Sequence, residues 1–508
     1  MLFNSPEFLF VFLPLVVAGF YFLRRFQSLN LLASWLLTAS MVFYGYWYPQ
    51  YLPLIAGAIL FNYGAGLLIE RADRWRKLWF IIGISANLAG LFYFKYTVFV
   101  LDSLNMVVDT GVHWESLALP LGISFFTFQK IAYLVDVYIG RKAEKNALAY
   151  GTFVLFFPQL IAGPIVHYSE ILPQLRELHK PQPVLHNLAV GLSILAVGLF
   201  KKAVIADSLA PWVKVVFAAA EAGKAPGLME AWLGALAYTF QLYFDFSGYS
   251  DMAVGLGLMF GIRLPVNFWS PYKATSLIDF WRRWHMTLSR FLRDYLYIPL
   301  GGNRKGPARR YLNLLLTMLL GGIWHGAGWT FVLWGALHGL GLACNHLWRE
   351  QVASRIPVLR RIGSGGWLPT FGLVVVAWVL FRAESLPGAI LILQGMSGAN
   401  GLWATVPQAF AGLSPGLAFP VLAGLGIWCA LAPNTIQIFR RENPALGIPD
   451  FDPPAASLED RSLWRIIRYR LARLAWRPAW AWSLLTALLL VAALLTLTQI
   501  SEFIYFDF

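Results

Sequence analysis

The stretch LLGGIWHGAGWTFVLWGALHGL, residues 319–340, places two histidines in a segment that is otherwise almost wholly apolar and rich in glycine. Apolar windows of about 20 residues, the length that crosses the hydrocarbon core of a bilayer, recur along the whole chain. A polar side chain at that depth is costly unless it finds a partner, so an imidazole there is a candidate functional group. The stretch therefore predicts a membrane-embedded helical fold with a site inside it.

The composition is that of a membrane protein. The chain has 508 residues, of which 58% are hydrophobic and 13% are charged, whereas soluble domains have about 25% charged residues. Its Lys and Arg residues, which give a net charge of +14, lie in short clusters between apolar segments, as the positive-inside rule expects. We therefore do not expect nucleic acid as a partner. Cys344 and Cys429, both in apolar surroundings, predict neither a disulfide framework nor a cysteine metal site.

The apolar windows predict an all-α, polytopic integral membrane protein with roughly 11–13 spans. Because the windows continue along the whole chain, residues 1–508 are expected to form a single membrane domain. Residues 228–260 are long enough to form one span or two pieces. The predicted spans are residues 7–23, 29–48, 51–70, 79–101, 117–137, 150–166, 184–206, 228–260, 312–326, 329–348, 366–383, 416–434 and 478–498.

Charges between the spans predict the orientation of the chain. Arg24 and Arg25 follow a first apolar run that has no basic segment before it and no small-residue cleavage site, which predicts a retained span with its N-terminus outside. The loop 102–116 has three acidic residues and no Lys or Arg, so we expect it on the same extracytoplasmic side. Basic clusters that predict the cytoplasmic side lie at residues 24–25, 71–77, 141–145, 201–202, 282–310, 349–361, 440–441 and 461–477.

Two segments do not fit simple membrane crossings. Residues 150–166 contain Pro158, Gly163 and Pro164, and residues 319–329 are rich in glycine. Non-helical backbone at membrane depth is tolerated only where protein or a water-filled cavity satisfies it. Both segments are therefore predicted to be re-entrant or broken helices around a tunnel through the bilayer.

Two basic segments are predicted to lie at the cytoplasmic interface. In residues 276–300, aromatic and apolar residues alternate with arginines at helical spacing, which predicts one amphipathic interfacial helix. Residues 436–477 are expected to form a basic cytoplasmic loop, whose end at 461–477 has six arginines among Leu, Ile and Trp and predicts a second amphipathic helix. The apolar face of the first helix would consist of Trp281, Trp284, Leu288, Phe291 or Leu292, and Tyr295.

Three histidines are of interest for a site. His325 is flanked by glycines, which allow other backbone or a ligand to come close; the alternative is a histidine that is hydrogen-bonded between helices for packing. His338 follows 13 residues later, about 20 Å along a continuous helix, so it shares a site with His325 only where the chain breaks at the glycines. The position of His285, beside the apolar face of the amphipathic segment, by itself predicts an interfacial residue.

Buried carboxylates form a second polar group. Asp245 and Asp251 lie among aromatic residues, with Tyr249 and Asn267 nearby. Carboxylates inside a membrane face a bundle interior or an aqueous cavity, so these are candidates for a tunnel wall or for orienting a histidine. The alternative is a structural network of aspartate with arginine or tyrosine. The sequence contains no phosphate-binding loop, no H-E-x-x-H and no Cys/His metal spacing, so we predict no metal and no nucleotide hydrolysis.

Several motifs together resemble the membrane-bound O-acyltransferase family, and within it the bacterial proteins that acetylate exopolysaccharides such as alginate. The two longest are DFWRRWHMTLSRFLRDYLYIPLGGNRKG at residues 279–306 and NLLLTMLLGGIWHGAGWTFVLWGALHG at residues 313–339. The others are FYFKY at 92–96, LPLGISFFTFQKIAYLVDVY at 119–138, FFPQLIAGPI at 156–165, QLYFDFSGYSDMA at 241–253 and FIYFDF at 503–508.

The resemblance implies two catalytic histidines in a tunnel that joins the membrane faces. His325 matches the histidine of the family's W-H-G motif. His285, 40 positions upstream, matches its second polar residue, which replaces the interfacial interpretation. A neutral imidazole can take the proton of an incoming hydroxyl, the general-base role expected of His325, while His285 is expected to polarise the acyl carbonyl or position the donor. The further tunnel or orienting candidates are Asp245, Asp251, Tyr249, Asn267 and His338.

The resemblance also implies the reaction and its setting. An acetyl group is expected to pass from a cytoplasmic donor, acetyl-CoA or another acyl thioester, across the bacterial inner membrane, with no permanently bound cofactor. The expected partners are a periplasmic or membrane-anchored acetyltransferase, a polysaccharide synthesis complex and membrane lipids. Basic residues could attract the anionic donor, although positive-inside topology also explains them. These residues are Arg282, Arg283, Arg290, Arg293, Arg304 and Lys305.

Three alternatives stay open at this point. D-alanyl transfer to teichoic acid belongs to the same family and uses a carrier protein as donor, for which a basic cytoplasmic surface would be suited. A transporter or lipid scramblase would use broken helices and a polar tunnel without any covalent step. A non-catalytic assembly platform would depend on exposed loops rather than on His325.

Overall fold

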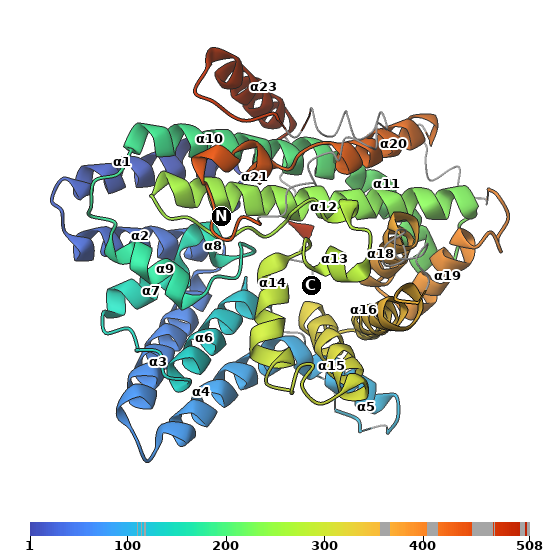
Figure 1. The fold of residues 1–508 in the computed structure, drawn as a ribbon, viewed down its shortest axis with the longest axis horizontal. Coiled ribbons are helices and arrows are strands. Elements are labelled where there is room, and N and C mark those ends of the chain that lie inside the picture. Colours follow the sequence, from blue (N-terminus) through green and yellow to red (C-terminus); the bar gives the residue numbers. More distant parts are fainter. Residues whose placement is uncertain are drawn as a thin grey trace.

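The fold is known from a computed structural model, which describes residues 1–108, 110–112, 114–115, 118–355, 366–403, 415–449, 471, 473–497 and 503–504. Within these ranges the chain consists of helices and loops, with one isolated bridge between Pro265 and Leu446. Figure 1 shows the long helix α12 (Leu228–Met259) crossing most of the width of the molecule. The prediction of an all-α fold is confirmed.

The helices follow the apolar windows of the sequence. Those of the first half are α1 Leu13–Arg24, α2 Leu29–Gly45, α3 Leu52–Arg71, α4 Arg76–Leu91, α5 Thr97–Asn105, α6 Ile123–Tyr138, α7 Ala147–Leu155, α8 Phe157–Leu160, α9 Tyr168–Arg176, α10 Val184–Phe200, α11 Asp207–Glu221 and α12. Those of the second half are α13 Leu277–Trp281, α14 Met286–Leu292, α15 Pro307–His325, α16 Trp329–Leu347, α18 Trp367–Arg382, α19 Leu386–Met396, α20 Pro415–Leu431, α21 Thr435–Ile438 and α23 Trp480–Thr496.

Short π-helical and 3-10 segments extend or connect these helices. The π-helical segments are η1 Phe8–Phe12, η3 Phe92–Tyr96, η4 Lys201–Ala206, η6 Arg293–Tyr297 and η7 Trp348–Ala353. The 3-10 segments are η2 Pro49–Tyr51, η5 Pro271–Lys273 and η9 Arg440–Glu442. Because η3 and η4 join neighbouring helices, they create two of the three described helical runs that are long and apolar enough to cross a bilayer, namely Pro49–Arg71, Arg76–Asn105 and Val184–Glu221. Six shorter apolar helices accompany these runs in the described part of the chain.

The predicted interruptions are mostly found. Residues 150–166 break as expected, because α7 ends at Leu155, α8 has four residues, and the chain from Ile161 to His167 is non-helical. The glycine-rich segment breaks between α15 and α16. Residues 228–260, in contrast, form the single helix α12, so the two-piece alternative is wrong. The amphipathic helix predicted within 461–477 lies largely outside the described residues.

The close packing of α10 against α12 forms the frame of the molecule, and Figure 1 shows the two helices running side by side. They touch through glycines. A Cβ atom at Gly198 would lie 2.6 Å from the carbonyl oxygen of Gly248, and one at Gly255 would lie 2.5 Å from that of Gly191. Because the obstructing atoms are backbone, neither helix can accept a side chain at these points without moving.

Two lysines that the charge pattern assigned to a cytoplasmic cluster form ion pairs within this frame. Lys202 forms ion pairs with Asp245 at 2.7 Å and with Asp207 at 2.8 Å, and its side chain is 1% exposed. Lys201 forms an ion pair with Asp251 at 2.6 Å. Buried carboxylates on α12 require cationic partners, and η4 supplies them. The cytoplasmic side expected for residues 201–202 stays a prediction.

The glycine contacts give a prediction for stability. Gly255→Ala should lower the free energy of unfolding by about 1–3 kcal/mol, the usual cost of overpacking a closely packed interface. Gly57→Ala in α3 is the control, because a Cβ atom there would meet nothing within 4 Å. Thermal unfolding in detergent, followed by size-exclusion chromatography, measures the difference. Equal midpoints for the two variants would contradict the packing argument.

Candidate active site

His285 lies at an interruption between two short helices. α13 ends at Trp281 and α14 begins at Met286, and His285 between them has a left-handed φ of 41°, which is uncommon for a residue other than glycine. The prediction of one amphipathic helix over residues 276–300 is therefore wrong. The interruption turns His285 into the protein, where it is 0% exposed.

The side-chain amide of Asn267 orients the imidazole of His285. The Oδ1 atom of Asn267 accepts a hydrogen bond from the backbone N–H of Thr287 at 3.3 Å and from the Thr287 hydroxyl at 2.8 Å, and it lies 3.0 Å from Nδ1 of His285. A backbone N–H can only donate, so this atom of Asn267 is an acceptor and Nδ1 of His285 must donate to it. The neutral imidazole therefore carries its proton on Nδ1 and its lone pair on Nε2. Asn267 was among the orienting candidates.

Aromatic rings surround His285 and connect it with the segment that contains His325. The centroid of the His285 ring lies 4.8 Å from that of Phe246 and 6.5 Å from that of Trp324. Trp324 in turn packs against His325, with centroids 4.9 Å apart. The two histidines predicted to be catalytic are thus brought to the same indole ring, although they lie 40 residues apart in sequence.

His325 is the last residue of α15 and is 4% exposed. Its ring centroid lies 5.0 Å from that of Trp334 on α16 and 5.1 Å from that of Phe381 on α18. The helix ends here because Gly326 adopts an extended conformation, and a Cβ atom at Gly326 would lie 2.1 Å from the ring of Phe331. The glycine break predicted beside His325 is confirmed.

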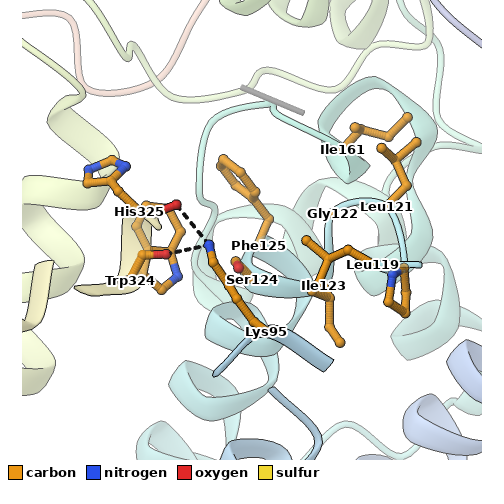
Figure 2. A pocket seen from close by; sticks show the side chains of 11 residues that line it. Lys95, Leu119, Leu121, Gly122, Ile123, Ser124, Phe125, Ile161, Trp324 and His325 are labelled. Carbon is orange, nitrogen blue, oxygen red and sulfur yellow. Dashed lines mark hydrogen bonds between the residues drawn. The ribbon is translucent and has the colours of Figure 1, made fainter. Parts of the chain in front are cut away.

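A small, partly open pocket lies beside the end of α15 (Figure 2). Most of its wall comes from the non-helical segment before α6 and from the first turn of α6, and Figure 2 shows the ring of His325 turned away from Lys95. Sequence reasoning missed Lys95, whose only signal was a lysine inside an apolar span. The lining residues are Lys95, Leu119, Pro120, Leu121, Gly122, Ile123, Ser124, Phe125, Ile161, Trp324 and His325.

His338 lies close to this site because the chain does break at the glycines. Helix α16 returns alongside α15, and the indole of Trp334 lies between the two imidazoles, with its centroid 5.0 Å from that of His325 and 4.7 Å from that of His338. The indole N–H of Trp281 donates to Nδ1 of His338 at 3.3 Å. This contact joins α16 to α13, the helix that precedes His285.

The carboxylates of α12 are engaged elsewhere. Asp245 also accepts the backbone N–H of Ile504 at 3.3 Å, and Asp251 accepts the hydroxyl of Thr435 at 2.6 Å, besides their lysine partners. Tyr249 packs between Phe3 and Phe503, with ring centroids 4.8 and 4.3 Å away. The partners of the aspartates are thus lysines, where the sequence suggested arginine or tyrosine, and the orienting contact found for His285 comes from Asn267.

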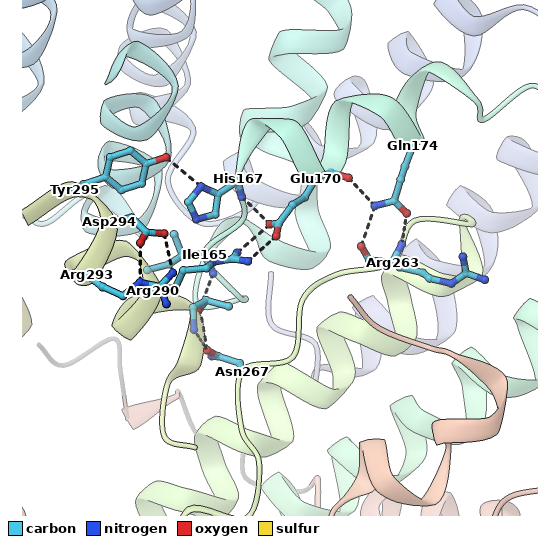
Figure 3. A network of polar contacts seen from close by, with 11 residues as sticks. Ile165, His167, Glu170, Gln174, Arg263, Asn267, Arg290, Arg293, Asp294 and Tyr295 are labelled. Atoms are coloured by element: carbon cyan, nitrogen blue, oxygen red, sulfur yellow. Dashed lines mark hydrogen bonds and ion pairs between the residues drawn. The ribbon is translucent and has the colours of Figure 1, made fainter. Parts of the chain in front are cut away.

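Three of the six predicted donor-binding residues have carboxylate partners. Arg290 forms a two-pronged ion pair with Glu170 at 2.5 and 2.9 Å, and Arg293 pairs with Asp294 at 2.7 Å (Figure 3). Arg283 pairs with Asp279 at 2.8 Å. The three that are exposed and form no ion pair within the described ranges are Arg282, Arg304 and Lys305. In the part of the chain that the structure describes, no three His, Cys, Asp or Glu side chains are arranged to hold a metal ion.

Comparison with known proteins agrees with this arrangement. Residues 144–382, which include both histidines, match the membrane-bound O-acyltransferase (MBOAT) family. A peptidoglycan O-acetyltransferase of Helicobacter pylori is 45% identical over 430 residues, covering 79% of this chain and 81% of the relative. The chain therefore belongs to the membrane-bound O-acyltransferase family, and it is an O-acyltransferase embedded in a membrane.

Other relatives show where in the family the chain falls. A probable alginate O-acetylase AlgI of Pseudomonas aeruginosa is 45% identical over 441 residues, covering 84% of this chain and 82% of the relative. A teichoic acid D-alanyltransferase of Streptococcus thermophilus is 27% identical over 334 residues, covering 62% and 77%. The similarity is higher to the acetylating relatives.

The contact between Asn267 and His285 gives a prediction for activity. Asn267→Ala should lower the rate of acyl transfer roughly 10-fold, because loss of a buried hydrogen-bond acceptor frees the imidazole to rotate and leaves donors unsatisfied. Asn267→Asp keeps an acceptor at the same place and should retain more activity. Transfer from an acyl thioester, measured on detergent-purified protein, compares the variants.

Ser250→Ala is the matched control, because it removes the acceptor of the Asn267 amide nitrogen, at 3.2 Å, and keeps the Oδ1 atom of Asn267 that faces His285. It should transfer at nearly the wild-type rate. A wild-type rate for Asn267→Ala would show that Asn267 does not position His285.

Proposed function

We propose that this protein is an O-acetyltransferase of the bacterial inner membrane that passes an acetyl group from a cytoplasmic acyl thioester, such as acetyl-CoA, to an acceptor on the opposite face. The acetyl group would then serve O-acetylation of an extracellular or envelope polysaccharide such as alginate. The observation that carries the proposal is the placement of His285 and His325 at two helix interruptions next to the same residue, Trp324.

The position of the two histidines supports a transfer between faces. His285 lies within the basic segment 282–310, which the charge pattern predicts on the cytoplasmic side. The pocket beside His325 is walled by Leu119–Gly122, which follow the acidic loop 102–116 that is expected outside. Donor and acceptor would therefore approach from different sides.

The chemistry follows from the two imidazoles. His325 takes the proton from the acceptor hydroxyl as the oxygen attacks the thioester carbonyl. The tetrahedral intermediate collapses, the C–S bond breaks, and the thiolate takes the proton back from His325, so that an ester and a free thiol are formed. The neutral tautomer of His285 presents a lone pair at Nε2, which suits it to accept a hydrogen bond from the donor and argues against the carbonyl-polarising role expected from the resemblance.

The relatives support acetyl as the transferred group. Proteins named for acetylation of peptidoglycan or alginate are 44–47% identical to this chain, whereas those named for D-alanyl transfer to teichoic acid are 27–28% identical. A periplasmic or membrane-anchored acetyltransferase that completes the modification of the polymer remains the partner that we propose. D-alanyl transfer from a carrier protein is the second candidate, since Arg304 and Lys305 would suit an acidic carrier.

The role of His325 can be tested in a single-turnover reaction with labelled acetyl-CoA. His325→Ala should lower the rate of acetyl transfer roughly 100-fold or more, as expected when a general base is removed. His346→Ala is the control, because His346 lies in the last turn of α16, where its Nδ1 is 3.9 Å from Glu350. A variant without His325 that still transfers acetyl at the wild-type rate would contradict the general-base role of His325. Labelled D-alanyl carrier as the only accepted donor would favour the second candidate.

The donor side gives a separate prediction. Arg304→Glu combined with Lys305→Glu should raise the KM for acetyl-CoA several-fold, and more at low ionic strength, because exposed charges act through a screened field. Arg74→Glu, an exposed arginine in another basic cluster, should leave the KM near its wild-type value. Initial rates at increasing donor concentration measure the effect, and an equal KM in all three proteins would remove the basic segment from donor binding.

A further inference from the structure

The end of α15 presents backbone carbonyl groups that the helix itself does not satisfy. Gly326 is extended, with φ −154° and ψ 149°. The last backbone hydrogen bond of the helix is therefore the one that the N–H of Gly326 donates to the carbonyl oxygen of Gly322. The next three carbonyls belong to Ile323, Trp324 and His325. Inside a membrane protein no bulk water takes their place, so donors must come from elsewhere in the chain.

Two adjacent side chains of the π-helical segment η3 supply these donors. The ammonium of Lys95 donates to the carbonyl oxygens of Trp324 at 2.7 Å and His325 at 2.8 Å (Figure 2). The hydroxyl of Tyr96 donates to the carbonyl oxygen of Ile323 at 3.0 Å. All three terminal carbonyls are thus held by one segment that lies about 230 residues away in sequence and that belongs to the motif FYFKY.

The charge of Lys95 strengthens this contact. An ammonium at the C-terminal end of a helix lies at the negative end of the helix dipole, and hydrogen bonds from a charged donor are stronger than neutral ones. No carboxylate forms an ion pair with Lys95 within the described ranges. The carbonyl dipoles of Trp324 and His325 therefore stabilise the ammonium of Lys95. In turn, Lys95 holds in place the backbone that carries the imidazole.

We propose that Lys95 and Tyr96 are positioning residues, which act through the end of α15 to hold His325 in its reactive place. This inference rests on the proposed role of His325. The side chain of His325 is attached to the same Cα atom as the carbonyl group that Lys95 binds, so a small displacement of this backbone moves the ring relative to the donor thioester. Loss of the ammonium should therefore slow the chemical step and leave donor binding unchanged.

Lys95→Met tests the proposal, because it removes the ammonium and keeps an apolar chain of similar length. It should lower kcat roughly 10- to 100-fold, the effect of losing charge-assisted hydrogen bonds, with the KM for donor within about twofold. Lys95→Arg, which keeps a charged donor, should recover part of the lost kcat. Tyr96→Phe, which removes one neutral hydrogen bond, should lower kcat by a smaller factor.

Lys130→Met is the matched control. Lys130 is also buried within the helices, where its ammonium lies 4.5 Å from the ring centroid of Phe126, and it makes no contact with α15 among those that the structure describes. This variant should keep a near-wild-type kcat and so separates loss of a buried charge from loss of the contact with α15. Equal losses of kcat in the Lys95 and Lys130 variants would overturn the proposal.

Two further outcomes are decisive. A wild-type kcat for folded Lys95→Met, or no recovery in Lys95→Arg, overturns the positioning role. If the Lys95→Met variant does not fold, the Tyr96→Phe variant provides the test, and an unchanged kcat in Tyr96→Phe overturns the proposal. The comparison is made with whichever acyl thioester the wild-type protein uses, so that failure of acetyl-CoA as donor counts against the proposed function and not against Lys95.

Discussion

A helix that ends inside a membrane protein leaves carbonyl groups that only the protein can satisfy, and the active-site region is arranged around one such end. Helix α15 stops at His325 because Gly326 is extended, and Phe331 occupies the place that a side chain at residue 326 would need. Its terminal carbonyls are then bound by Lys95 and Tyr96. An imidazole can lie at the end of α15 only because the first 100 residues of the chain supply these donors.

The same constraint explains the other histidine. The interruption between α13 and α14 releases backbone groups from helical hydrogen bonds, and the segment after α12 binds them. The backbone N–H of Met286 donates to the carbonyl of Asn267 at 2.9 Å, and that of Trp269 donates to the carbonyl of Arg283 at 2.9 Å. The side chain of Asn267 also accepts a hydrogen bond from His285. The same segment therefore binds the backbone groups at the interruption and sets the tautomer of the imidazole. Each histidine therefore lies at a break that a distant segment stabilises, which is how a non-helical backbone is tolerated at this depth.

The part of this arrangement that depends on local sequence could be predicted. The lengths of the apolar segments predicted the helices, and the glycines beside His325 predicted the break at the end of α15. The break before α14 could not be predicted, because the pattern of arginines and aromatic residues continues through it and the left-handed residue is His285 rather than glycine. Lys95 was missed because its partners are carbonyl groups, which every residue has and no motif reveals. The ion pairs of Lys202 could not be predicted, because the positive-inside rule counts charges and does not consider the buried carboxylates that pair with them.

The ion pairs of α12 belong to the frame rather than to the chemistry, and this explains why the carboxylates expected near the histidines are found elsewhere. A buried ion pair adds little net stability but is costly to break, so it fixes how two helices align. Lys201 and Lys202 each take a different aspartate of α12, while the glycine contacts fix the distance between α10 and α12. The chain leaves the end of α12 and reaches Asn267 eight residues later. The alignment of α10 with α12 thus determines where Asn267 lies, and through Asn267 the direction in which His285 faces.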